Sequence, residues 1–484
     1  MGAATAAASE PRPPNIIFIM ADDLGYGELG CYGQEKIRTP HLDELAQAGV
    51  RFTRHYAGNA VCAPSRCVLM TGMNPGHAWI RDNSEVQPEG QKPIPAGTIT
   101  VARVLQQQGY ATAAMGKWGL GPPGSAGDPL KQGFDHFYGY NCQRHAHNFY
   151  PTYLWDDDRR VELNNPAFSP YQKLPDDADP NSPESYRGFQ GTDYAPDLIG
   201  REARRFVREH RDQPFYLYLP TTVPHLALQV PDDSLQEYLG QWPDPPYPGG
   251  HAYLPHFAPR AAYAAMVTRM DREVGRLVAL VRELGLEEQT IFVFTSDNGP
   301  TYDRLGGSDS EFFHSASGMR GLKGSLYEGG VRVPLIVRWK GSIAGGRVED
   351  RLCGFEDWLP TLLDLAGFKA AIPATVDGIS FAPLLRGERQ VARPFLYREF
   401  PDYGGQQALW LGEWKGIRQN LVPTQEGQSP DYHIQLYDLA LDRSETRDVS
   451  ADHPDVVARI DALMRSARRP STEFPFPALD RLGP

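Results

Sequence analysis

The sequence has little cysteine, no excess of basic residues and no long apolar run. Only five of its 484 residues are cysteines, and their irregular spacing without a CxxC motif excludes a disulfide-rich scaffold and a cysteine-based zinc site. The formal net charge of −12 argues against a nucleic-acid-binding protein, which would carry a basic face. No stretch approaches the roughly 18 apolar residues of a membrane helix. An anionic substrate would therefore have to be held by local positive charge.

Strand-like and helix-like segments alternate along most of the chain. Short apolar runs at 15–21, 111–116, 215–220, 290–295 and 334–339 are typical of buried strands, and the segments 98–108, 197–211 and 260–284 have helical spacing. This alternation predicts an α/β fold with a large, mostly parallel (mixed) sheet sandwiched between helices.

The pattern changes near residue 377. FLYREF, ALWLGEWKGIRQ and IQLYDLALD are typical of short antiparallel strands, and HPDVVARIDALMRSAR of a closing helix. We therefore expect a large domain over residues 1–376 and a small C-terminal α+β domain over residues 377–484.

Polar residues follow four of the predicted strands. They are Asp22-Asp23, Lys117, His225 and Asp297-Asn298. The carboxyl ends of strands in such a sheet are where ligands bind. Carboxylate and amide oxygens suit Ca²⁺ or Mg²⁺ rather than Zn²⁺. Asp, Asn and Gly also favour turns, and a turn would explain either acidic motif by itself. The presence of both motifs at strand ends in one chain favours a metal site.

Several cations fall in similar strand-end loops. Arg66, Lys117, Lys323 and Arg320 are candidates to clamp a tetrahedral oxyanion beside the metal. His225 and His314 are candidates to move protons. The alternative is a solvated surface charge, and for His314 that alternative is as good as a functional role.

Cys62 stands in the segment VCAPSRCVLMTG. Its thiolate is a poor ligand for a hard cation. A tyrosine-phosphatase loop would place Cys and Arg six positions apart, whereas Arg66 lies only four beyond Cys62. A buried structural cysteine and a local Cys62–Cys67 bridge, which needs tight geometry, both remain open.

The segment CAPSRCVLMTG resembles the signature of the formylglycine-dependent sulfatases of the alkaline phosphatase superfamily, above all the bacterial carbohydrate sulfatases. Further similar segments follow in order: IIFIMADDLGYGELGCYG, VARVLQQQGYATAAMGKWGLG, TSDNGP, RGLKGSLYEGGVRVPLIVRW and YDLALDRSETRDVS. The resemblance spans nearly the whole chain. It implies an arylsulfatase-like hydrolase of sulfate monoesters, with residues 1–376 as the catalytic domain.

The resemblance also implies the chemistry. A formylglycine-generating enzyme would convert Cys62 to formylglycine (3-oxoalanine), and Ca²⁺, rather than Mg²⁺, would be held by Asp22, Asp23, Asp297, Asn298 and residue 62. The aldehyde hydrate would attack sulfur, helped by Asp297 and supported by Arg66. Lys117, Lys323 and His225 would hold the sulfate, and His225 or Lys323 would protonate the leaving alcohol. Sulfate would then be expelled as the aldehyde re-forms.

One departure from the family concerns the lysine motif. Many members have GKWHLG, whose His is thought to drive the elimination, but this chain has GKWGLG with Gly119 at that position. Candidates for the missing base are His77, His145, His147 and His314. Of these, His145, His147 and His314 are also candidate substrate contacts, and His147 is favoured.

The substrate and the cellular location are expected from resemblance alone. Aromatic residues at 136–160 (Phe137, Tyr138, Tyr140, Tyr150, Tyr153 and Trp155) are candidates for a sugar platform, although such rings also form ordinary core. A sulfated galactose or N-acetylgalactosamine, with sulfate at position 4, is the expected substrate. The segment MGAATAAASEPRPP is not an intact signal peptide, and its Ala-rich part resembles the remainder of one, so a periplasmic or secreted bacterial protein is expected.

Two other classes of protein remain open. A phosphate or phosphonate monoester hydrolase would share the fold, although the His and Asp ligands of a second metal are not found in motif positions. A non-catalytic sulfoglycan-binding protein would keep Cys62 unmodified.

Overall fold

The computed structural model describes residues 12–423, 425 and 428–483. The N-terminal segment in which a leader remnant was expected lies largely outside these ranges. Among the described residues, every helix is too short or too polar to cross a bilayer.

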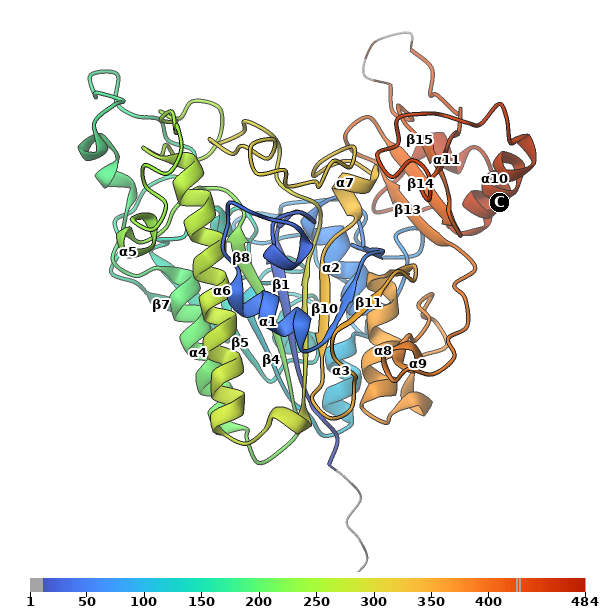
Figure 1. The fold of residues 1–484 in the computed structure, drawn as a ribbon, viewed down its shortest axis with the longest axis horizontal. Coiled ribbons are helices and arrows are strands. Elements are labelled where there is room, and N and C mark those ends of the chain that lie inside the picture. Colours follow the sequence, from blue (N-terminus) through green and yellow to red (C-terminus); the bar gives the residue numbers. More distant parts are fainter. Residues whose placement is uncertain (1–11, 424, 426–427, 484) are drawn as a thin grey trace, which may run out of the picture.

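A ten-stranded mixed sheet forms the centre of the molecule, as the sequence predicts (Figure 1). The strand order is β11-β2-β10-β9-β1-β8-β4-β5-β6-β7. The strands are β1 (Asn15–Asp22), β2 (Val50–Phe52), β4 (Ala111–Lys117), β5 (His136–Tyr140), β6 (Tyr153–Asp156), β7 (Arg159–Glu162), β8 (Phe215–Pro224), β9 (Thr290–Ser296), β10 (Leu335–Arg338) and β11 (Arg347–Glu349). The five strands from β9 to β5 in this order run parallel, so their carboxyl ends lie on the same edge.

Helices cover both faces of this sheet. The helices α1 (Pro40–Gln47), α4 (Ala195–Glu209) and α6 (Pro259–Glu283) pack on one face, and α2 (Cys62–Thr71), α3 (Val101–Gln107) and α8 (Trp358–Leu365) on the other. Strand β1 is apolar throughout because its side chains are buried on both faces of the sheet. Ile17 and Ile19 enter the first core, whereas Ile16, Phe18 and Met20 enter the second.

The C-terminal part contains a separate four-stranded antiparallel sheet. It consists of β13 (Leu396–Phe400), β14 (Gln406–Leu411), β15 (Trp414–Arg418) and β16 (Gln435–Asp438), and α10 (Pro454–Ser466) packs on it. The domain boundary at residue 377 stays a prediction.

The remaining short strands and α-helices are β3 (His55–Tyr56), β12 (Cys353–Gly354), α5 (Asp232–Leu235), α7 (Glu328–Val331), α9 (Ala382–Leu385) and α11 (Pro477–Asp480).

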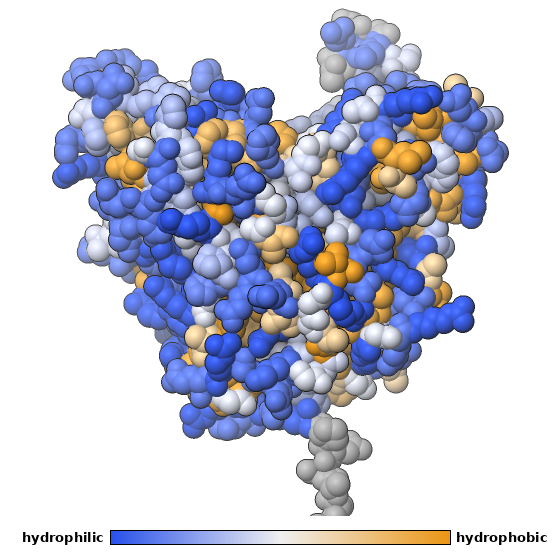
Figure 2. Space-filling model, viewed as in Figure 1, coloured by the Kyte–Doolittle hydropathy of each residue, from blue (hydrophilic) through white to orange (hydrophobic). Residues whose placement is uncertain are grey.

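The sequence patterns gave no direction for β10, which pairs antiparallel with both β9 and β2. The space-filling view shows a notch at the upper edge of the molecule, between a lobe around α5 and the lobe of the C-terminal sheet (Figure 2). The carboxyl ends of the parallel strands point toward this notch.

Candidate active site

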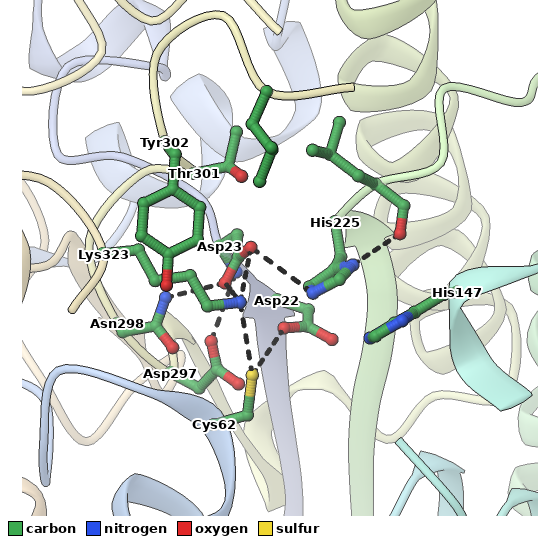
Figure 3. A network of polar contacts seen from close by, with 12 residues as sticks. Asp22, Asp23, Cys62, His147, His225, Asp297, Asn298, Thr301, Tyr302 and Lys323 are labelled. Atoms are coloured by element: carbon green, nitrogen blue, oxygen red, sulfur yellow. Dashed lines mark hydrogen bonds and ion pairs between the residues drawn. The ribbon is translucent and has the colours of Figure 1, made fainter. Parts of the chain in front are cut away.

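Three of the parallel strands, β9, β1 and β4, bring the predicted acidic and basic residues together at one edge of the sheet. Asp22 ends β1, Lys117 ends β4, and Asp297 directly follows β9. Asp23 turns away from β1 with a left-handed backbone (φ 65°), and its N–H donates to Oδ1 of Asp297 at 3.2 Å. These side chains meet in one buried group. Figure 3 shows its three carboxylates beside Cys62 and Lys323.

Cys62 enters this group from the first position of α2. Its side chain is only 1% exposed. The thiol Sγ lies 3.5 Å from Oδ1 of Asp22, 3.5 Å from Nζ of Lys117 and 3.7 Å from Nζ of Lys323. The N-terminal end of a helix adds positive potential, which favours an anion beside residue 62. Cys31, Cys62, Cys67, Cys142 and Cys353 are all free thiols, so the Cys62–Cys67 bridge is absent.

The rest of the CAPSR segment fixes this helix start. Pro64 stands in the first turn, where a missing N–H has no cost. The Ser65 hydroxyl donates to the carbonyl of Asp297 at 2.5 Å and accepts from the N–H of Gly58 at 3.0 Å. The N–H of Ala63 donates to Asn83 Oδ1 at 3.1 Å. Sequence reasoning gave no role to Ser65 or Asn83, although the Ser of the motif was a usable signal.

Each buried carboxylate has a cationic partner. Arg66 donates to Oδ2 of Asp297 from Nε at 3.1 Å and from a terminal nitrogen at 2.7 Å, and also donates to the carbonyl of Lys117. Lys117 Nζ lies 2.6 Å from Asp22 Oδ2, and Lys323 Nζ lies 2.8 Å from Asp23 Oδ1. Buried charges persist when paired in this way, because an unpaired one is strongly destabilising.

Burial and charge shift the pKa values in this group in different directions. Burial raises the pKa of Asp297 to about 6, with the nearby Asp22 adding to the effect. Burial also raises the pKa of Asp23, against the opposing effect of Lys323. For Asp22 burial is outweighed by Lys117, His225 and Arg66, so its pKa falls below the usual range. Burial raises the pKa of Cys62 to about 12, so an unmodified Cys62 is a neutral thiol and a weak nucleophile.

The donor set fits a hard cation. Ligand atoms of Asp22, Asp23, Cys62 and His225 all lie within 4.8 Å of one another. Asn298 donates through Nδ2 to Asp23 Oδ1 at 2.8 Å, while its Oδ1 is buried with no hydrogen-bond partner among the described residues. An unpartnered buried oxygen beside three carboxylates is suited to Ca²⁺ or Mg²⁺.

Two of the predicted histidines line one side of the group. His225 Nε2 is 3.6 Å from Asp23 Oδ2, and its Nδ1 contacts the carbonyl of Leu226 at 2.5 Å. The His147 ring stacks on it at 4.5 Å, and Nδ1 of His147 contacts the Tyr171 hydroxyl at 2.6 Å. Burial, reinforced by neighbouring cations, holds the pKa of both imidazoles well below the usual value.

The other candidate histidines lie elsewhere. His145 begins the 3₁₀ turn η3 (His145–His147) and packs against Tyr153 at a ring distance of 4.4 Å. His314 is exposed, and its backbone packs against Gly27. His77 contacts Asp377 at 3.0 Å. Arg320 lies over the Tyr327 ring at 3.9 Å and donates to the Glu445 carbonyl at 3.2 Å.

The GKWGLG departure has a structural counterpart. Gly119 has φ +81°, which a residue with a side chain rarely adopts, and a Cβ placed there would lie 2.9 Å from Nε2 of Gln143. That amide nitrogen is buried without a hydrogen-bond partner among the described residues. The space on this side of Gly119 is therefore filled by Gln143, and a histidine would not fit there without rearrangement.

Of the aromatic residues at 136–160, for which sugar platform and ordinary core were both open, most form core. Phe137, Tyr140 and Tyr150 are at most 3% exposed and belong to the core, because β5 and the chain after it pack against helices. Tyr138 packs against the core as well. The rings that approach the buried group come from distant loops: Tyr253 lies 5.8 Å from the His225 ring, and Tyr302 stands beside Lys323 and Asn298 (Figure 3). No periodic pattern marks such loop residues.

Comparisons with known proteins identify the family of this chain. The family model described as Sulfatase matches residues 14–368, and the model for the C-terminal part of N-sulphoglucosamine sulphohydrolase matches residues 322–469. Human arylsulfatase A is 34% identical over 466 residues, which cover 90% of this chain and 83% of the relative. N-acetylgalactosamine-6-O-sulfatase of Bacteroides thetaiotaomicron is 30% identical over 508 residues, covering 94% of this chain and 93% of the relative.

Solved structures give the same result. A Bacteroides thetaiotaomicron structure from work on the metabolism of multiple glycosaminoglycans is 28% identical, with a TM-score of 0.74 over 95% of this chain and all of that chain (100%). The Sulfatase model alone spans well over half of the sequence. This chain therefore belongs to the sulfatase family, within the alkaline phosphatase superfamily, and is an arylsulfatase-like sulfuric ester hydrolase.

Proposed function

We propose that this sulfatase releases sulfate from a carbohydrate of the galactose or N-acetylgalactosamine type, with a formylglycine formed from Cys62 as nucleophile and Ca²⁺ as its metal. The observation that carries the proposal is the position of the Cys62 side chain, which lies among Asp22, Lys117 and Lys323 in one buried group. A thiol held neutral at this place is a poor reagent, whereas a maturation product with two hydroxyl oxygens would fit the oxygen-rich surroundings.

Asp22, Asp23, Asp297 and Asn298 would hold the metal together with residue 62. The bound cation would supply positive charge beside the nucleophile and the sulfate oxygens. The unpartnered Oδ1 of Asn298 and the convergence of three carboxylates support this assignment.

The remaining residues would bind sulfate and move protons. Lys117 and Lys323 stand on either side of residue 62, each within 3.7 Å of Sγ, and would hold the sulfate oxygens. Arg66 orients the Asp297 carboxylate, which would accept the proton of the attacking hydroxyl. His225 Nε2 faces the same space. The negative charge of a bound sulfate ester would favour the protonated form of this imidazole, which, with Lys323, would supply the proton for the leaving alcohol.

His147 would contact the substrate as the ring behind His225. His145 and His314 are proposed as substrate contacts only, since the structure brings neither into the buried group. With Gly119 packed on Gln143, the proton for the elimination step would go to a group already present, such as His225.

The sugar is supported by a relative and by sequence resemblance. The Bacteroides relative at 30% identity is an N-acetylgalactosamine-6-O-sulfatase. This relative supports N-acetylgalactosamine as the sugar. It also makes position 6 of the sugar a second candidate for the sulfate, besides position 4, which was expected from the sequence. A panel of galactose and N-acetylgalactosamine sulfated at each position would discriminate between them by released sulfate. A periplasmic or secreted location stays a prediction.

The proposal is tested with purified wild type and Cys62→Ala on an aryl sulfate and an aryl phosphate. We expect the wild type to prefer the sulfate, and Cys62→Ala to have no measurable turnover while keeping its circular dichroism and Tm. Retained sulfatase activity in Cys62→Ala would overturn the nucleophile assignment. A preference for the phosphate would favour the phosphate or phosphonate monoester hydrolase.

A further inference from the structure

A groove of about 530 Å³ opens beside His145 and Asn148, which flank the His147 segment. This volume lies within the roughly 300–1,000 Å³ typical of small-molecule sites. Its lining includes Glu85, Glu89, Arg144, His145, Tyr153 and Arg160. Of these residues only His145 has a role proposed above, as a substrate contact.

A continuous series of contacts joins the groove to the buried group. His225, which faces Asp23, stacks on His147, and Nδ1 of His147 contacts the Tyr171 hydroxyl at 2.6 Å. The guanidinium of Arg144 lies over the other end of this series, 5.3 Å from the Tyr171 ring centre, and Arg144 lines the groove. The groove therefore lies beyond His225, on the side where the leaving alcohol would take its proton.

Glu89 is a fixed acceptor in the groove wall. Its carboxylate accepts from the Tyr153 hydroxyl at 2.7 Å, from Trp155 Nε1 at 2.8 Å and from Arg160 at 3.0 Å. Nδ1 of His145 is buried 3.8 Å from Glu89 Oε1, beyond hydrogen-bond range and without a partner among the described residues. A ligand hydroxyl between the two would satisfy His145.

The charges of the groove balance. Arg160 pairs with Glu89 at 3.0 Å, and Arg144, whose side chain is 57% exposed, makes a loose 3.7 Å contact with Glu85. Burial lowers the pKa of His145 to about 4, so this imidazole is neutral near pH 7. Paired charges beside aromatic rings offer hydrogen bonds in both directions without net attraction for an anion, which suits the hydroxyls of a sugar.

We propose that this groove binds the sugar unit next to the sulfated one, on the leaving-alcohol side, and that this second unit is neutral and rich in hydroxyls. The inference rests on the proposed function, and it makes the preferred substrate an oligosaccharide rather than a monosaccharide. His145 and Arg144 would contact the second unit directly, and Glu89 would accept from its hydroxyls.

The test compares kcat/KM for three probes: an aryl sulfate, N-acetylgalactosamine sulfate, and that sulfated sugar joined to a neutral galactose. The sulfate is placed at whichever of positions 4 and 6 the wild type hydrolyses. Ala167→Trp fills the groove from an exposed position in its lining. Ala370→Trp is the matched control, because Ala370 is exposed on the 3₁₀ turn η7 (Lys369–Ala371) and does not line the groove. Arg144→Ala removes one contact without filling the space.

We expect the wild type to prefer the disaccharide over the monosaccharide by about tenfold, the equivalent of one or two good hydrogen bonds. Ala167→Trp should remove this preference while leaving aryl sulfate turnover unchanged, and Ala370→Trp should match the wild type. Arg144→Ala should raise KM for the disaccharide several-fold with little change in kcat.

Equal kcat/KM for the monosaccharide and disaccharide in the wild type would overturn the inference while leaving the proposed function intact. A clear preference for a disaccharide whose second unit is a uronate would also overturn the inference, because the proposed second unit is neutral. Failure of the wild type on every sulfate ester, the aryl sulfate included, would instead overturn the proposed function itself.

Discussion

Replacing Lys415 tests how the C-terminal sheet supports the active site. Lys415 lies in β15 with 0% exposure, and its Nζ is 3.1 Å from Glu328 Oε1 and 2.7 Å from Glu445 Oε1. Glu328 begins α7, five residues after Lys323, and also accepts from Tyr56 at 2.7 Å and Trp410 at 2.8 Å. The sheet thus anchors the loop that carries Lys323.

Lys415→Met would remove the shared cation of two buried glutamates: Glu328 keeps Arg332 at 3.0 Å, whereas Glu445 loses its cationic partner. Removing one partner of a buried ion pair costs about 3–5 kcal/mol. At roughly 2 °C per kcal/mol for a large domain, Tm should fall by about 6–10 °C. Lys340→Met is the matched control, because Lys340 makes a half-exposed ion pair with Glu287 that is worth under about 1 kcal/mol.

The loss of stability in Lys415→Met should also depend on pH. Burial raises the pKa of Glu445 to about 7 in the folded protein, although Lys415 opposes this effect. Because the folded pKa is raised, this carboxyl contributes stability at low pH, and that stability is lost as pH rises toward 7. Without Lys415 the folded pKa rises further. The stability difference between Lys415→Met and wild type should therefore be larger at pH 8 than at pH 5.

The assay is thermal unfolding followed by circular dichroism at both pH values, with aryl sulfate kinetics on the same samples. We also expect a lower kcat/KM, because the Lys323 loop loses an anchor. If Lys415→Met were as stable as Lys340→Met at pH 8, the anchoring role of the C-terminal sheet would be refuted.

Two further predictions concern the buried group. Exhaustive chelation, continued long enough for slow metal release, should lower kcat, and added Ca²⁺ should restore it; unchanged activity would count against the metal ligands. Arg66→Ala should lose both sulfatase activity and about 3–5 kcal/mol of stability, because the Asp297 carboxylate is left buried without its main partner. Denaturant unfolding measures this loss, and a change below 1 kcal/mol would contradict it.

The residues at the strand ends could be located from the sequence because the geometry of a parallel sheet brings them together. Asp22, Lys117, His225 and Asp297 each follow an apolar run, and parallel strands bring such ends to one edge. Arg66 was expected in a strand-end loop, but it lies with Cys62 on helix α2. For Cys62 only the likeness of the CAPSR segment to a known family indicated the site.

Loop residues were beyond the reach of sequence patterns. Tyr171, Tyr253 and Tyr302 approach the site from long irregular segments whose path depends on tertiary contacts such as the His147–Tyr171 bond. For the rings at 136–160 the sequence left core and sugar platform both open, because an apolar ring after a strand fits both equally well and only packing decides.

The central claim is that residue 62, converted from cysteine, is the group that takes sulfate from the substrate. The direct measurement is the mass of the tryptic peptide 55–66 in several preparations, set against their specific sulfatase activity. Formylglycine is lighter than cysteine by the exchange of sulfur for oxygen and the loss of two hydrogens. We predict that activity rises in proportion to the converted fraction and vanishes without it. Full activity in a preparation whose peptide carries only the intact thiol would contradict the account.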